Sequence, residues 1–258
     1  MAKITTARGQ DVHFVDHGGT GPALVLLHSF LMDESMFAPQ VLRFSPTHRC
    51  ITIDERGHGG TPAEAGFTYW DVAEDVIAVL DHLGIEQAVF SGTSQGGFIA
   101  LRIALLAPER VRALAVLGSS GEREDPEVAD SYRRIAAAWR EHGPVDQLLD
   151  AVASLCLGEF DAEEWKAKWR KVSGDHLTTI LDTLVDRDDL TARLPEIHVP
   201  ALVLHGDADA AYPLAKARLI AERLPNAELV VVPGGAHFLS LTDPDAVNES
   251  LARFLSQN

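Results

Sequence analysis

The chain has 258 residues, of which 46 % are hydrophobic and 23 % are charged, which suits one large globular domain and excludes disordered and fibrous proteins. A formal net charge of −16 makes nucleic acid and anionic membrane surfaces poor partners. No stretch reaches the roughly 18 uninterrupted apolar residues of a membrane span.

The N-terminal segment 1–14 contains no apolar run of signal-peptide length, so we expect a cytoplasmic protein. Cys50 and Cys156 are too few for a disulfide framework, and the sequence does not say whether they meet. In a reducing compartment we expect two free thiols.

Residues 4–18 alternate around Arg8-Gly9 and predict an antiparallel hairpin at one edge of a sheet. Continuous apolar runs then predict strands that are buried on both faces, as in a parallel sheet. Segments of helical period lie between them and predict a twisted, mostly parallel α/β sheet flanked by helices. The predicted strands are 23–28, 50–54, 88–92, 113–118, 201–206 and 228–234. The first two predicted helices lie in 71–84 and 96–111, and Pro108 closes the second of them.

The pattern changes between about 121 and 195, where four helical segments follow one another without a strand-like run. They are 122–143, 145–158, 161–172 and 175–194. A group of helices inside a β/α alternation predicts an insertion above the sheet. Trp139, Trp165 and Trp169 lie in it, and the sequence does not decide whether each lines a pocket or packs helices together.

The motif Gly92-Thr93-Ser94-Gln95-Gly96 follows a predicted strand and opens a predicted helix. This G-x-S-x-G pattern in that context predicts a sharp, strained turn that exposes the serine hydroxyl at a helix N-terminus. The residues two before and two after the serine come close together in such a turn, so both positions require glycine. Ser94 is therefore the candidate nucleophile.

A serine needs a base to remove its proton and an acid to orient the base. His237 follows the last predicted strand in a small-residue loop, at the sheet edge where open α/β sheets bind ligands. We expect the other histidines to be structural, with His28 and His58 shaping turns. The preceding strand ends near Asp207 and Asp209. We favour Asp209, because in a loop of the form G-x-x-D followed by a proline that starts the next helix, the second aspartate normally points into the site.

With this order of nucleophile, acid and base, the chain resembles the α/β-hydrolase superfamily over essentially its whole length. The resemblance rests on "LLHSF", "IDERGHGGT", "GTSQGG", "VLHGDADAAYP" and "GGAHF". It implies an α/β-hydrolase core (1–120 and 196–258) with a helical cap (121–195). The nearest groups are small bacterial esterases, 3-oxoadipate enol-lactone hydrolases and cofactor-free haloperoxidase or perhydrolase relatives.

By the same resemblance, the backbone N–H groups of Phe30 and Gln95 form the oxyanion hole. The loop "HSFLMD" departs from the commoner H-G-x-P, with Ser29 in place of glycine and Leu31 in place of proline. Ser29 is therefore a further candidate to offer a hydroxyl to the substrate. Besides Phe30, the candidate pocket residues are Leu31, Met32, Trp139, Leu155 and Tyr212, chosen by position.

The leading hypothesis is a serine hydrolase that cleaves a carboxylic ester or lactone through an acyl-enzyme, with a small molecule as substrate and neither metal nor organic cofactor. The same three residues also occur in carbon–carbon bond hydrolases and perhydrolases, and in small-molecule receptors that keep the triad. The substrate is not defined by the sequence, and the oligomeric state stays open, with a homodimer as one option.

Overall fold

The computed structural model describes residues 2–63 and 66–258. Eight strands form one sheet in the order β1-β2-β4-β3-β5-β6-β7-β8. The pairs β1–β2 and β2–β4 are antiparallel, and every later pairing is parallel. The strands are β1 (Ala2–Thr5), β2 (Asp11–Asp16), β3 (Ala23–Leu27), β4 (Arg49–Ile53), β5 (Ala88–Thr93), β6 (Val111–Leu117), β7 (Ala201–Gly206) and β8 (Ala227–Val232).

The sheet confirms the predicted strands and the hairpin at the edge. In β2 the burial alternates, with Val12 and Phe14 facing the core, as expected for an antiparallel strand with one face open to water. The central strands β3, β5 and β7 are buried along their whole length. Their continuous apolar sequence follows from having helices on both faces.

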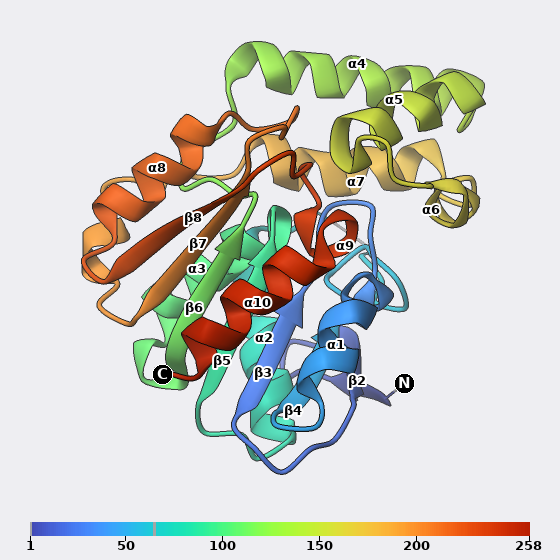
Figure 1. Ribbon diagram of the computed structural model, residues 1–258. Helices are drawn as coiled ribbons and strands as arrows, with labels where there is room; N and C mark the ends of the chain where they lie inside the picture. The colour runs from blue at the N-terminus through green and yellow to red at the C-terminus, as the bar shows by residue number, and fades with distance from the viewer. Residues whose placement is uncertain (1, 64–65) are drawn as a thin grey trace.

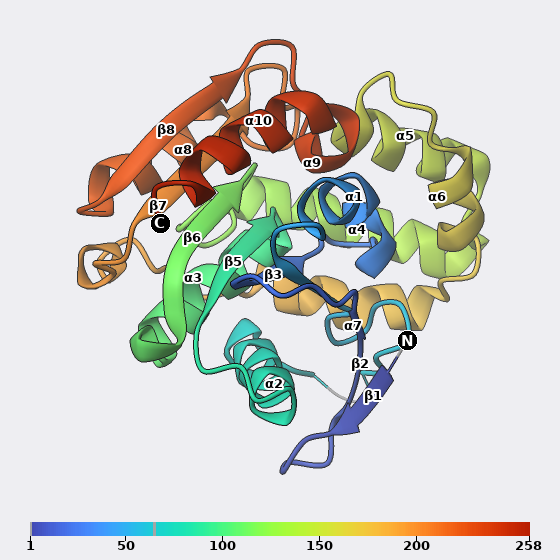
Figure 2. The ribbon, with the colours of Figure 1, turned by 60° about the horizontal axis from the view of Figure 1, so that its bottom comes forward.

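Helices cover both faces of this sheet. In Figures 1 and 2, α1 and α10 lie on one face, and α2 and α3 lie on the other. The helices of the α/β part of the chain are α1 (Ala38–Phe44), α2 (Tyr69–His82), α3 (Gln95–Leu106), α8 (Leu214–Arg223), α9 (Leu239–Thr242) and α10 (Pro244–Leu255). Short 3₁₀ helices lie at Glu34–Phe37 (η1), Pro108–Arg110 (η2) and Leu194–Glu196 (η3).

The helix predicted in 96–111 ends at Leu106, which confirms that Pro108 closes it: Ala107, the residue before the proline, does not adopt helical angles, and Val111 already belongs to β6. One other helix ends earlier than the sequence predicts. The helix predicted at 175–194 ends at Val185. The polar residues after it leave the helix because they make tertiary contacts, such as Asp188 with Arg102.

Four helices between β6 and β7 lie together above the carboxyl ends of the parallel strands (Figure 1). They are α4 (Pro126–His142), α5 (Asp146–Leu157), α6 (Glu163–Trp169) and α7 (Gly174–Val185). The exact division into core and cap at residues 121 and 195 stays a prediction. Within the described ranges, no helix has both the length and the apolarity to cross a bilayer.

Candidate active site

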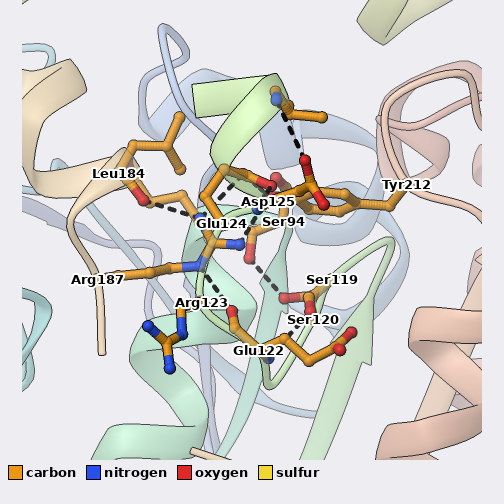
Figure 3. Close-up of polar contacts among 12 residues, drawn as sticks. Ser94, Ser119, Ser120, Glu122, Arg123, Glu124, Asp125, Leu184, Arg187 and Tyr212 are labelled. Atoms are coloured by element: carbon orange, nitrogen blue, oxygen red, sulfur yellow. Dashed lines mark hydrogen bonds and ion pairs between the residues drawn. The ribbon is translucent and has the colours of Figure 1, made fainter. Parts of the chain in front are cut away.

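Ser94 occupies the sharp turn between β5 and α3. Its backbone φ is +51°, and only Leu31 among the other described non-glycine residues also has a positive φ. Side-chain-bearing residues rarely adopt this region, and such strain collects at functional sites. The turn is held because the Ser94 amide donates to the Leu117 carbonyl at 2.8 Å and the Ser119 hydroxyl donates to the Ser94 carbonyl at 2.8 Å (Figure 3).

The glycines of the motif are required by close backbone contacts. A Cβ atom on Gly92 would lie 2.2 Å from the carbonyl of Gly96, as the sequence predicts. A Cβ atom on Gly96 would lie 2.0 Å from the Leu27 carbonyl oxygen in the neighbouring strand. These two positions therefore allow α3 to start directly against the end of β3, which places Ser94 at the carboxyl edge of the sheet.

The structure brings together the three residues that the sequence singles out. His237 Nε2 lies 2.9 Å from Ser94 Oγ, and His237 Nδ1 lies 2.7 Å from Asp209 Oδ2. With the Nδ1 proton donated to Asp209, Nε2 is free to accept the serine proton. The Tyr212 ring packs edge-on against the imidazole, with centroids 5.2 Å apart.

Asp209 is held as an ionised hydrogen-bond acceptor. Its Oδ1 accepts from the amides of Ala211 and Tyr212, both at 2.8 Å. Burial raises the pKa of this carboxyl, but the neighbouring His237 and these hydrogen bonds outweigh burial and leave the pKa below its ordinary value. The alternative acid, Asp207, is exposed and accepts from the Gly234 amide, so it shapes the adjacent loop.

The two residues whose amides are expected to form an oxyanion hole lie next to Ser94 in sequence (Gln95) and on the wall of the same cavity (Phe30). The Gln95 amide is the first of α3, and so has no acceptor within the helix. Phe30 follows β3 and lines the same cavity as Ser94. The next residue, Leu31, has a φ of +63°, which a proline at that position cannot adopt. The loop therefore has its own shape, and the Trp169 indole, donating to the Leu31 carbonyl at 2.7 Å, holds it.

Hydrogen bonds to neighbouring backbone groups confirm the prediction that His28 and His58 shape turns. His28 Nε2 accepts from the Glu55 amide at 3.0 Å, and His58 Nδ1 contacts the Arg56 carbonyl at 3.0 Å. Burial and the nearby His28 lower the pKa of His58 to about 3, so this ring is neutral. Ser29 lines the cavity, and its fully buried hydroxyl makes no hydrogen bond to the described residues.

An apolar cavity opens from Ser94 between the sheet and the helices above it. The α4, α5 and α7 helices supply most of its wall. The lining residues are Ser29, Phe30, Leu31, Ser94, Tyr132, Ile135, Ala136, Trp139, Val152, Leu155, Cys156, Leu177, Leu181, Leu184, Ala211, Tyr212, His237 and Phe238.

Most of the predicted pocket residues line this cavity, but Met32 does not. Met32 is buried outside the cavity wall, because the turn at Leu31 directs the chain away from Ser94. Trp139 lines the cavity, whereas Trp165 and Trp169 pack beside it. Cys156, like Cys50, is a free thiol, and burial raises its pKa to about 12, so it acts as an apolar part of the wall.

A buried ion pair lies behind the cavity wall and was missed by sequence reasoning. Arg187, which follows α7, donates to Glu124, which precedes α4, at 3.0 Å. The Tyr212 hydroxyl donates to the same carboxylate at 2.9 Å, and Arg187 contacts that hydroxyl at 3.2 Å (Figure 3). This cluster joins both ends of the α4–α7 segment to the loop that carries Asp209. Neither charged residue stands in a motif that would reveal it.

The comparisons with known proteins agree with this fold. Residues 22–244 match the family model described as the alpha/beta hydrolase fold. The chain is 30 % identical to a putative non-heme chloroperoxidase of Synechocystis, over 95 % of both chains. The enol-lactonase of Burkholderia xenovorans LB400 superposes with a TM-score of 0.88 at 28 % identity, over 99 % of this chain and 100 % of that one. A thermophilic esterase from Thermogutta terrifontis superposes with a TM-score of 0.87 at 26 % identity, over 99 % and 98 %.

The chain therefore belongs to the α/β-hydrolase fold family. It is a hydrolytic enzyme of that fold, as the names of these esterase and lactonase relatives indicate.

Proposed function

We propose that the protein is a serine hydrolase of carboxylic esters or lactones that works through an acyl-enzyme on Ser94. The observation that carries the proposal is the unbroken hydrogen-bonded chain from Ser94 Oγ through His237 to Asp209. His237 takes the serine proton as Oγ attacks the carbonyl carbon, and Asp209 stabilises the resulting imidazolium. The amides of Phe30 and Gln95 donate to the oxyanion of the tetrahedral intermediate.

His237 then returns its proton to the leaving alkoxide, which departs as an alcohol. A water molecule enters and gives a proton to His237 while its oxygen attacks the acyl carbon. Collapse of the second tetrahedral intermediate releases the carboxylic acid and restores the Ser94 hydroxyl. For a lactone, the alcohol and the acid are two ends of one product.

We further propose that the acyl group is uncharged and apolar. No Lys, Arg, Asp or Glu lines the described cavity. Arg187, a cation just behind the wall, is already paired with Glu124 and is not free to bind an anionic substrate. A carboxylate placed in this cavity would lose its hydration without gaining a partner, which costs several kcal/mol.

Two p-nitrophenyl esters of equal length test both proposals, the hexanoate and the singly esterified adipate. We expect sustained turnover of the hexanoate, with kcat/KM about 10²-fold or more above that of the adipate ester, because only the latter buries a carboxylate. Equal rates would contradict the proposed substrate class. A single stoichiometric burst with both esters would contradict the hydrolase proposal and favour a receptor. Faster perhydrolysis than hydrolysis when hydrogen peroxide is added would favour the peracid-forming alternative.

A further inference from the structure

Glu55 is a buried carboxyl that the proposed mechanism does not use. It follows β4 in the "DERGHGG" turn and is 1 % exposed. One carboxyl oxygen, Oε2, accepts from the Gln95 side-chain amide, and the other, Oε1, makes no hydrogen bond to the described residues. A buried carboxyl with an unpaired oxygen is unfavourable for folding, so the presence of such a residue calls for a physical reason.

The side chain of Glu55 anchors one of the two expected oxyanion donors. The Gln95 amide group donates to Glu55 Oε2, and Gln95 Oε1 accepts from the Tyr69 hydroxyl at 3.0 Å. Gln95 is therefore held at both ends of its side-chain amide. These two hydrogen bonds hold Gln95 in place, and the backbone N–H of Gln95 is the expected oxyanion donor at the start of α3.

The main chain of Glu55 anchors the other donor. Its amide donates to His28 Nε2 at 3.0 Å, which leaves the proton on Nδ1 for the Ser29 carbonyl, at 2.8 Å. The Ser29 carbonyl belongs to the same planar peptide unit as the Phe30 N–H. Holding the carbonyl oxygen therefore sets the direction of the Phe30 N–H, which points the opposite way.

We propose that Glu55 is a positioning residue that sets the two oxyanion donors relative to each other, through its main chain for Phe30 and through its side chain for Gln95. This inference rests on the proposed serine hydrolase function. Because a misplacement of about 1 Å can lower a catalysed rate about 10²-fold, such a link between two loops is expected to affect kcat more than KM.

The charge state of Glu55 gives the proposal a signature in the pH profile. The titratable groups that face Glu55 are Asp54 on its own loop, His28 at the end of β3 and Tyr69 in α2, and no lysine or arginine is placed against it within the described ranges. Burial raises the pKa of Glu55 to about 7 and outweighs the neighbouring His28 and the hydrogen bond from Gln95, which both lower it, while Asp54 adds to the rise. Above that pH a buried negative charge develops beside the oxyanion donors and opposes the charge of the transition state.

The test compares Glu55→Leu and Glu55→Gln with the wild type on p-nitrophenyl hexanoate from pH 5.5 to 9. Glu55→Leu removes the acceptor for Gln95, and we expect kcat to fall about 10- to 100-fold with KM within about twofold. Glu55→Gln keeps an acceptor oxygen but cannot ionise. We expect it to match the wild type near pH 6 and to exceed it roughly three- to tenfold at pH 8.5, where the wild type declines.

Ser91→Ala serves as the matched control, because the Ser91 hydroxyl is also buried without a hydrogen bond to the described part of the chain but lies within β5. It should leave kcat and the pH profile unchanged. The proposal would be overturned if Glu55→Leu kept the kcat of the wild type. It would also be overturned if the activity of Glu55→Gln declined above pH 7 as that of the wild type does. If Glu55→Leu does not fold, the profile of Glu55→Gln decides alone. A wild type that turns over no ester at any pH would refute the hydrolase function itself, which is a separate result.

Thermal unfolding gives a second readout that does not depend on catalysis. A carboxyl whose pKa is higher in the folded state binds protons more strongly there, so the stability that it confers falls as pH rises from about 4.5 to about 7. Glu55→Gln has no such loss. The Tm of this variant minus that of the wild type should therefore increase between pH 5 and pH 8, and a constant difference would contradict the buried ionisation.

Discussion

Replacing Ser94 with alanine is expected to lower kcat for ester hydrolysis by about 10⁶-fold, the loss typical of removing the nucleophile from a serine triad. The reason is that Ser94 is the one hydroxyl that hydrogen-bonds to His237 among the described residues. Ser29 and Cys156 also line the cavity, but neither has such a base, and burial raises the pKa of the Cys156 thiol so that it stays protonated. Among the described residues, the Oγ atom hydrogen-bonds to His237 alone, so the folded state loses one contact.

Initial rates with p-nitrophenyl hexanoate measure the effect of this change, and thermal unfolding serves as its control. The Tm of Ser94→Ala should stay within a few degrees of the wild type. Turnover within about tenfold of the wild type would mean that a different group attacks the ester.

Replacing Asp209 with asparagine is expected to lower kcat by about 10⁴-fold, whereas Asp207→Asn should change it by less than about threefold. Asp209 accepts the Nδ1 proton of His237 at 2.7 Å, and this bond keeps Nε2 free for the serine proton. An asparagine amide at 209 can instead donate to Nδ1, which places the proton on Nε2 and blocks the base. The Asp207 carboxylate accepts from the Gly234 amide and has no hydrogen bond to His237 among the described residues, so its charge is not needed for the tautomer.

The two asparagine variants form a matched pair, because both residues lie on the loop after β7 and both changes preserve size. Steady-state kinetics of both variants on one ester decide between them. A larger loss in Asp207→Asn would assign the acid to the wrong residue. Equal, small losses in both variants would show that no carboxylate orients His237.

Local sequence signals predicted the elements that place the candidate nucleophile and base. The glycines around Ser94 reflect backbone contacts within a short segment, and the apolar runs reflect burial on both faces of a sheet. The loop after the last strand suggested His237 for the same reason, since parallel strands bring their carboxyl ends to one edge. These features depend on neighbours in sequence or on a general rule of sheet geometry.

The cavity wall and the ionic contacts depend on how distant segments meet, and no short pattern encodes that. Met32 stands next to Leu31 in sequence, yet the positive φ of Leu31 sends the two residues to different places. The ion pair of Glu124 with Arg187 joins the two ends of the helical segment α4–α7. The role proposed for Glu55 depends on its contact with Gln95, which is distant in sequence. The sequence predicted a helix over 175–194, but not that Leu177, Leu181 and Leu184 of this segment would line the cavity.

Mass spectrometry of the enzyme after reaction with diethyl p-nitrophenyl phosphate tests the central claim most directly. This reagent phosphorylates an activated serine and releases p-nitrophenol, which leaves a stable diethylphosphoryl adduct in place of the acyl group. We expect one adduct per chain on the peptide that contains Ser94, no adduct in Ser94→Ala, and loss of ester turnover in proportion to labelling. An adduct on any other residue, or full ester turnover in an enzyme fully labelled at Ser94, would contradict it.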